Sequence, residues 1–464
     1  MKQMNIQKDD YMKKLFILLF VIIMLFCGCE SNVIEEDINS IDIFTPAQTQ
    51  PRIEKIFDFS SNPVAQSTFV LLEDGSIWYW GLFYKPGNKI TDIVYEIESD
   101  PIEGKYTQVE KEVTYNDLAL IELPQKLEFE GIDLKNNVKD IVNLELSTFV
   151  LLKNGDLYSF GANTVAGILG DGTTYDRATP KKILSGVSEI HNFSKGVSLN
   201  YPPSSSVENE KNSLSPLEKH RYFSGGVMYA LKENGELYSW GYNWVGDLYN
   251  GTYEDSAVPV KIQDNVKSLY GNIRNGLLVE KFDGTLFMPS PSDDVTGPST
   301  KLEATFRTKS EILNAYNLWI DNKNFISVLY KNGELWHYNK NGQGSLFEKD
   351  VKEFNGSEFL KSDGTLYKYK SINEAIKIDS NIKTIKTGMV YNDNSIYTSD
   401  LNGNKYRIEK VLSATTSYHI NNETKYLYAR GYCGKNCALG IELNPGEEFI
   451  EMPVQVLFPA GWNK

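Results

Sequence analysis

Apolar and polar positions alternate along this chain in short runs, and one hairpin pattern returns eight times. In each copy a polar turn precedes a spacer, an aliphatic residue and an aromatic residue. Period-two alternation bounded by turn residues predicts strands, and the 3.6-residue period of amphipathic helices is nearly absent. The eight aliphatic–aromatic pairs are Ile77-Trp78, Leu157-Tyr158, Leu237-Tyr238, Leu286-Phe287, Leu335-Trp336, Leu366-Tyr367, Ile396-Tyr397 and Leu427-Tyr428.

The turns before these pairs are also similar to one another. Six of them contain Asp-Gly or Asn-Gly, beginning with Asp74-Gly75. Such dipeptides favour a two-residue turn in which both central residues have positive φ. Asp393-Asn394 is a weaker version, and Thr424-Lys425 has lost the turn chemistry but precedes the same outgoing strand. We therefore expect eight β-hairpins.

The spacing of the hairpins predicts the architecture. Measured from the Gly or its equivalent, the gaps are 80, 80, 49, 49, 31, 30 and 31 residues. One unit thus needs about 30 residues, which accommodates four short strands. The longer gaps hold insertions, at 82–118 and 196–220, which are expected to be loops. Four-stranded units repeated along a chain predict an all-β fold, a β-propeller of seven to eight four-stranded blades.

The chain ends suggest how the ring closes. The strand Met452–Leu457 follows the last hairpin and has no later unit to join. Pairing it with Ile53–Phe59 would cover two exposed sheet edges. We therefore expect a propeller over residues 53–458, closed by pairing of the N- and C-terminal strands, and a short tail at 459–464.

Two units carry a longer motif. Leu157–Asn163 and Leu237–Asn243 are each followed by a Gly-containing loop and then by a Pro-x-x-aliphatic strand, at 180–183 and 259–262. This pattern resembles the regulator of chromosome condensation repeat. The resemblance spans roughly residues 53–458 and implies a propeller that usually has seven blades, whereas eight hairpins are counted here.

The amino terminus predicts export. The basic pair Lys13-Lys14 precedes the apolar segment Leu15–Phe26. This combination is typical of a secretory signal, and the segment is shorter than the roughly 20 residues of a spanning helix. Gly28-Cys29 resembles the end of a bacterial lipoprotein signal, which implies cleavage before Cys29 and lipidation of its thiol. An uncleaved anchor and a plain secreted protein are the alternatives.

These features predict four segments of chain. Residues 1–28 are expected to be a lipoprotein signal peptide, and residues 29–52 a lipid anchor with a flexible, acidic tether. The propeller and the tail follow. The expected location is the bacterial cell membrane, on its extracytoplasmic face.

Two cysteines remain after this processing, Cys433 and Cys437. Outside the cell a disulfide between them can persist and would hold the loop of the last unit. Free thiols and a metal site are the alternatives, although the chain has only four histidines and none falls in a ligand-spaced pair. No metal and no cofactor are expected.

Charge and motifs restrict the function. The chain has a net charge of −14, and a field of that sign repels phosphate backbones, so nucleic-acid binding is not expected. It contains no Gly-rich phosphate loop, no Gly-x-Ser-x-Gly elbow and no His-Glu-x-x-His. We therefore do not expect an enzyme.

Aromatic residues gather in the loops that follow the aliphatic–aromatic strands. Tyr and Trp bury much area at low entropic cost and often anchor interfaces, although packing between blades is the alternative for each residue. The expected function is a monomeric, membrane-anchored extracellular propeller that binds a surface or extracellular protein through this rim. A glycan-binding module, or a hydrolase with its site in the insertions, is the alternative. The candidate partner-binding residues are Tyr84, Tyr242, Trp244, Tyr249 and Tyr253.

Overall fold

The structure is a computed structural model, and the residues that it describes lie within Gln50–Lys464. Cys29, residues 30–49 of the expected tether, the insertion at 196–220, Trp244 and the Cys433–Cys437 loop lie outside the described residues, so the predictions made for them stay predictions. The last three residues of the expected tether are described, and Gln50 Oε1 accepts a bond from Phe458 N at 2.9 Å, so these residues belong to the propeller. The described ranges are 50–58, 67–100, 105–144, 146–192, 226–243, 246–272, 276–289, 302–308, 310–321, 323–339, 341–386, 389–399, 405–414, 418–432 and 449–459.

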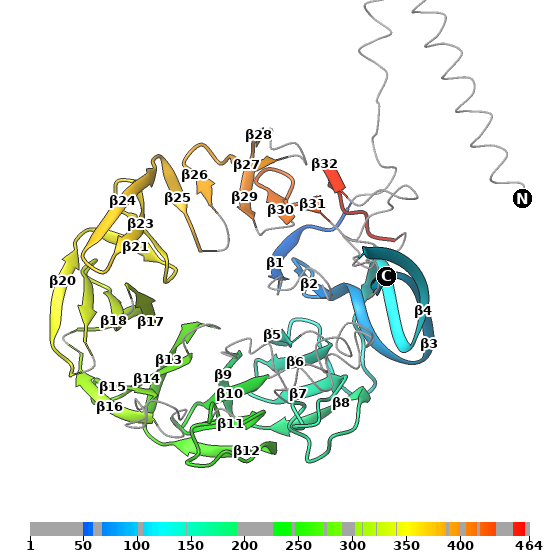
Figure 1. Ribbon diagram of the computed structural model, residues 1–464, viewed down its shortest axis with the longest axis horizontal. Coiled ribbons are helices and arrows are strands. Elements are labelled where there is room, and N and C mark those ends of the chain that lie inside the picture. Colours follow the sequence, from blue (N-terminus) through cyan, green and yellow to red (C-terminus); the bar gives the residue numbers. More distant parts are fainter. Residues whose placement is uncertain are drawn as a thin grey trace, which may run out of the picture. The chain divides into compact units, whose positions relative to one another are not determined.

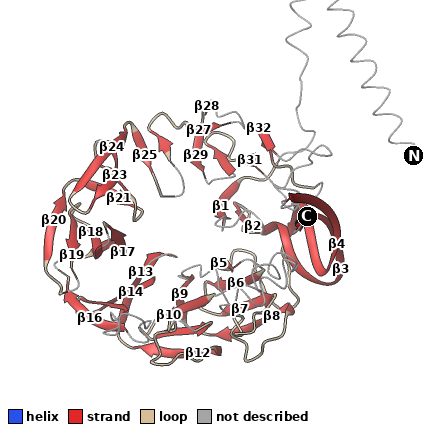
Figure 2. Ribbon diagram, viewed as in Figure 1, coloured by secondary structure: helices blue, strands red, loops and turns tan. Residues whose placement is uncertain are grey.

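All regular elements in these ranges are strands, as predicted (Figure 2). The strands of the first half form four antiparallel sheets, which we number as repeats 1 to 4. They are β1 (Ile53–Asp58), β2 (Ser67–Leu72), β3 (Ile77–Asp100) and β4 (Lys105–Lys126); β5 (Val138–Leu144), β6 (Ser147–Leu152), β7 (Leu157–Gly161) and β8 (Arg177–Leu184); β9 (Val187–Asn192), β10 (Val227–Lys232), β11 (Leu237–Gly241) and β12 (Ser256–Gln263); β13 (Val266–Asn272), β14 (Gly276–Lys281), β15 (Thr285–Pro289) and β16 (Leu302–Arg307).

The second half continues the same order as repeats 5 to 8. Its strands are β17 (Ile312–Ile320), β18 (Lys323–Tyr330), β19 (Leu335–Tyr338) and β20 (Gly344–Glu348); β21 (Val351–Phe354), β22 (Glu358–Lys361), β23 (Leu366–Ser371) and β24 (Glu374–Asp379); β25 (Ile382–Thr384), β26 (Val390–Tyr391), β27 (Ile396–Ser399) and β28 (Lys405–Ile408); β29 (Val411–Ala414), β30 (Tyr418–Asn421), β31 (Leu427–Tyr432) and β32 (Phe449–Gln455).

The sheets follow one another around a common centre, with the first strand of each on the inside and the last on the outside (Figure 1). Among the described residues, seven sheets have four strands, and repeat 7 consists of two two-stranded sheets, β25–β26 and β27–β28. The fold is therefore a β-propeller of seven four-stranded blades. The seventh of the eight predicted hairpins, at Asp393-Asn394, lies in the divided repeat 7, where β26 and β27 belong to separate sheets. No helix in the described part of the chain has the length and apolar character needed to cross a bilayer.

The hairpin turns differ from the predicted type. Only the second central residue has positive φ, for example Gly75 at 82°, and even Lys425 adopts it, at 64°. In the first hairpin Gly75 N donates to Leu72 O and Leu72 N donates to Ser76 O. These two bonds define a loop longer than the predicted two-residue turn, and Gly75 is its left-handed residue. The Asp or Asn before it contributes its side chain instead. Asp74 Oδ1 accepts a hydrogen bond from Ser76 N at 2.9 Å, and Asn154 and Asn234 bond Asp156 N and Glu236 N in the same way.

The same eight positions also join each repeat to the next. The carbonyl oxygen of each left-handed hairpin residue accepts a bond of 2.6–2.9 Å from a backbone N–H at or just before the first strand of the next repeat around the ring. Each turn is therefore a link between blades as well as a connection within one. The donor and acceptor residues are Asn136 and Gly75, Val187 and Gly155, Val266 and Gly235, Thr308 and Gly284, Val351 and Gly333, Ile382 and Gly364, Val411 and Asn394, and Ile53 and Lys425.

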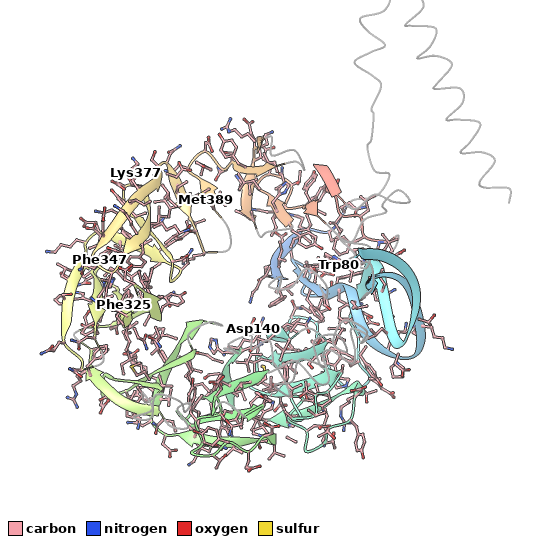
Figure 3. All side chains as sticks on the ribbon, viewed as in Figure 1. Trp80, Asp140, Phe325, Phe347, Lys377 and Met389 are labelled. Carbon is pink, nitrogen blue, oxygen red and sulfur yellow. The ribbon has the colours of Figure 1, made fainter. Side chains whose placement is uncertain are left out.

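The expected pairing of the terminal strands is not found among the described residues. β32 pairs with β31, and β1 pairs with β2. The reason is that the strand after each hairpin completes the sheet of that hairpin, as β8 pairs with β7, so no strand is left over at the end. Repeats 1 and 8 are joined through the Ile53–Lys425 bond and through one shared hydrophobic cluster, in which Trp80 Nε1 donates to Tyr418 Oη at 2.8 Å (Figure 3).

The first predicted loop insertion is a long hairpin. β3 and β4 stay paired from Leu82↔Leu120 to Asp100↔Lys105, across most of residues 82–118. Ile, Val and Tyr recur along both segments and favour extended structure in spite of the polar residues between them. The prediction of a loop was therefore wrong for this insertion.

The core lies between neighbouring sheets. One cluster combines Leu157 and Ile168 of repeat 2 with Met228 and Trp240 of repeat 3. The eight recurring aliphatic residues are each at most 2% exposed, which confirms their prediction as the buried centre of each unit. Full burial of one such side chain contributes roughly 1.5–3 kcal/mol.

Candidate functional site

The loop after β7, residues 162–176, is built around one buried asparagine. The Nδ2 group of Asn163 donates to Thr173 O and Tyr175 O at 3.0 and 3.2 Å, and its Oδ1 accepts from Leu169 N at 3.1 Å. The backbone N–H of Asn163 donates to Asp176 Oδ1 at 2.8 Å. One side chain therefore holds both ends of the loop in place.

The loop after β11 repeats this construction. Asn243 donates through Nδ2 to Thr252 O and Glu254 O at 2.9 and 3.0 Å, and its Oδ1 accepts from Leu248 N at 2.8 Å. Asp255 Oδ1 accepts a bond from Asn243 N at 2.6 Å. Burial raises the pKa of the Asp255 carboxyl. Both loops are thus rigid supports of the same design.

The two loops are also fixed to their surroundings. Asp171 is paired with Arg177 at 2.6 Å, and although burial opposes its ionisation, hydrogen bonds from Thr173 and Arg177 lower the pKa of its carboxyl. Across the seam to repeat 3, Gly172 N donates to Ala257 O at 2.8 Å, and Trp240 Nε1 donates to Ile168 O at 2.8 Å. The loop of repeat 2 therefore rests on repeat 3.

Large apolar side chains project from this rigid support. Tyr175 is 78% exposed and Val165 is 51% exposed on the first loop. Tyr253 on the second loop and Val258 at the start of β12, next to the Gly172–Ala257 bond, are each about half exposed, at 48% and 49%. We call Val165, Tyr175, Tyr253 and Val258 the rim surface.

The candidates from the sequence divide between surface and core. Tyr253 is exposed and belongs to the rim surface, and Tyr84 is half-buried on β3. Tyr242 and Tyr249 are only 8% and 4% exposed, and the ring of Tyr249 is stacked on Tyr229 at 6.3 Å, so both serve packing between strands and loops. Trp244 lies outside the described residues.

Sequence reasoning missed Tyr175. Tyr175 lies between Thr173, whose carbonyl oxygen bonds the Asn163 side chain, and Asp176, whose carboxylate bonds the Asn163 backbone. The position of Tyr175 within this loop was the available signal. In repeat 3 the same construction places Tyr253 between Thr252 and Glu254. Both tyrosines are exposed, Tyr175 at 78% and Tyr253 at 48%.

A second polar group lies between repeats 5 and 6. His337 on β19 contacts Tyr369 Oη through Nε2 at 2.9 Å and Ile372 O through Nδ1 at 3.1 Å, and Ser327 Oγ lies 3.4 Å from Tyr369 Oη. Phe325 and Phe347 flank the imidazole (Figure 3). Burial lowers the pKa of His337 to about 4. Ser327 is fully buried, so this chain of groups is part of the seam between two sheets and offers no accessible nucleophile.

Other features of the described residues give weaker candidates. A cleft of about 420 Å³ lies along the connection from β4 to β5, where it is bordered by residues 126–130 and 132–135 together with Ser76 and Ile77. It holds charges of both signs and no convergent set of donors or acceptors. In the described ranges, no group of three or more His, Cys, Asp or Glu side chains is placed to hold a metal ion.

Comparison with known proteins yields similar folds. No protein-family model and no curated protein sequence matches the chain. Human WBSCR16 is 12% identical, with a TM-score of 0.41, over 69% of this chain and 81% of that one. Yeast RCC1 (Prp20), in a structure bound to Kap60, is 16% identical, with a TM-score of 0.41, over 74% of this chain and 79% of that one. The Dos1 propeller is 10% identical, with a TM-score of 0.34, over 81% and 72%. At these identities and scores the likenesses carry no argument about partners or activity.

Proposed function

We propose that this chain is a binding propeller whose protein partner docks on the rim surface of repeats 2 and 3. The observation that carries the proposal is the 78% exposure of Tyr175 on a loop that Asn163 holds at both ends. Exposed apolar groups mark interaction surfaces when they gather on one face. Because the loop is already ordered, it would lose little conformational entropy when a partner binds.

The charge of the loops favours a basic partner. Residues 162–176 and 242–255 contain five acidic residues and no lysine or arginine. Asp247 is buried, Asp171 is paired with Arg177, and Asp176 is half-buried. Glu254 and Asp255 remain as exposed acids near Tyr253. Complementary charge mainly accelerates association and selects among partners. The proposed partner therefore presents apolar residues inside a basic surface.

The proposed setting is the outer face of a bacterial membrane. The apolar segment after Lys13-Lys14 and the Gly28-Cys29 pair support an anchor at Cys29, and residues 30–49 would supply a tether with a reach of very roughly 25 Å. In this role the propeller holds a partner near the membrane and performs no catalysis.

Affinity capture with residues 50–464 on intact cells and secreted proteins, followed by mass spectrometry, tests the rim surface. We expect the Tyr175→Ser variant to lose a protein that the unaltered chain retains, without a change in melting temperature. Phe282→Ser is the matched control, because Phe282 is 62% exposed in repeat 4, away from the rim surface. Equal retention by the Tyr175→Ser variant would refute the proposal, and displacement by free oligosaccharides would favour glycan binding.

A further inference from the structure

A second surface lies on the outer edge of repeat 6. β24 is the outermost strand of its sheet, so the backbone groups along one of its sides have no strand beside them in the described residues. Ile376 and Ile378 on this strand are 44% and 43% exposed, and Lys377 between them lies at the periphery (Figure 3). An exposed edge with apolar side chains is a template for another strand.

Four of the other seven outer strands in the described residues carry a residue that blocks such pairing. β4, β8, β12 and β32 contain Pro124, Pro180, Pro259 and Pro453, one each. Proline has no N–H to donate and is a common means of protecting a sheet edge. β24 is one of four outer strands without proline, with β16, β20 and β28, and it carries two exposed isoleucines where β20 carries one exposed leucine, Leu346. This edge has therefore kept the properties that strand addition requires.

The charge around β24 is opposite to that of the whole chain. Residues 366–386 contain five lysines and two acidic residues, in a chain of net charge −14. Lys370 is paired with Glu374 at 2.9 Å, whereas no ion pair within 4 Å involves Lys368 or Lys377 in the described part of the chain. Both of these lysines are exposed, and they are available to an acidic partner.

The register determines which peptide would fit. Ile376 lies opposite Lys368 and Lys377 lies opposite Tyr367, while a register shift near Leu366 leaves Ile378 as an extra residue. The regular part of the edge is thus short, near Ala375–Lys377, or about 10 Å. On an added strand, a residue opposite Ile376 would be apolar and its neighbour opposite Lys377 would be acidic, since directly paired residues share a face.

We propose that the edge of β24 binds a short extended peptide segment of alternating apolar and acidic residues, which adds to repeat 6 as a fifth strand. Backbone hydrogen bonds supply the attachment, and Ile376 and Lys377 supply the preference for sequence. This site is separate from the rim surface and does not depend on it.

Fluorescence polarisation with a labelled octapeptide of alternating valine and glutamate tests the proposal, with the whole propeller as receptor. We expect saturable binding that weakens at least tenfold with the Ile376→Lys/Ile378→Lys double variant and at least tenfold when alternate peptide nitrogens are methylated. Leu123→Lys is the matched control, because Leu123 is an equally exposed apolar residue, at 42%, on the outer strand β4, where Pro124 follows it, and this variant should bind like the unaltered chain. Melting temperatures confirm that the variants are folded.

Three results would overturn the proposal. The first is no binding up to about 1 mM peptide, which corresponds to a binding free energy weaker than about −4 kcal/mol. The second is equal binding of the methylated peptide, which would exclude strand addition. The third is dimerisation of the chain itself in sedimentation experiments, abolished by the double variant, which would assign the edge to a second copy.

Discussion

His337 gives the sharpest quantitative prediction, because its environment changes the pH dependence of stability. In the folded chain the pKa of His337 is lowered to about 4 from an ordinary value of 6.5, because burial between Phe325 and Phe347 disfavours the imidazolium ion. Ile372 O can only accept a hydrogen bond, so Nδ1 carries the proton of the neutral ring and Nε2 accepts from Tyr369 Oη. A second proton would enter a site that is already satisfied.

The sign of the effect follows from linkage. The unfolded chain binds the proton at a higher pH than the folded chain, so the stabilisation is fully present above pH 6.5 and is lost as the pH falls towards 4. Between pH 7 and pH 5 these two values correspond to a loss of about 2 kcal/mol from the free energy of unfolding. Titration of the carboxylates adds a further pH dependence to the free energy of unfolding.

Urea unfolding of the unaltered chain and a His337 variant at a series of pH values isolates the contribution of His337 to the free energy of unfolding. We expect the His337→Gln variant to be less stable than the unaltered chain at pH 7, because packing is disturbed, but to lose about 2 kcal/mol less between pH 7 and pH 5. Only the difference between the two slopes is diagnostic, since both chains share the carboxylate background. Parallel curves for the two chains would show that His337 is accessible to protons in the folded state and would refute the reasoning.

Two further predictions concern the seam between the chain ends and the anchor. Trp80→Phe should lower the free energy of unfolding by about 1–3 kcal/mol in urea titrations, because it leaves the buried Tyr418 hydroxyl without the Trp80 Nε1 bond; an unchanged midpoint would mean that this bond contributes nothing to joining repeats 1 and 8. Cys29→Ala should abolish incorporation of labelled fatty acid, because Cys29 supplies the acceptor thiol at the expected cleavage site after Gly28; continued labelling would contradict the lipoprotein interpretation.

The hairpin number could be predicted from the sequence, but the turn geometry could not. Asp74-Gly75 is compatible with either a two-residue turn or a longer loop, and the choice depends on where the strand hydrogen bonds begin. At Lys425 the chain adopts the same left-handed conformation without any favourable residue. There the conformation accompanies the bond from Ile53, which is contributed by the other end of the chain.

In the candidate site, too, local sequence predicts one part of the structure and tertiary contacts decide another. Tyr249 and Tyr253 are four residues apart in one loop, and local sequence does not distinguish their environments. Tyr249 is buried against Tyr229, whereas Tyr253 projects from the segment clamped by Asn243. Burial of a loop side chain depends on the strand that lies opposite it, and that strand is distant in sequence.

The sequence by itself determined the repeated local structure: eight hairpin turns, each followed by an aliphatic residue that is at most 2% exposed. These features depend on turn chemistry and side-chain alternation over a few residues, which every copy of the repeat carries. The tertiary structure decided what joins the copies: the division of repeat 7, the Ile53–Lys425 bond, the paired strands of the first insertion and the exposure of Tyr175. The Ile53–Lys425 bond joins opposite ends of the described chain, and the β3–β4 pairing and the Asn163 bonds reach beyond the few residues of one turn, so the spacing of one repeat does not specify them.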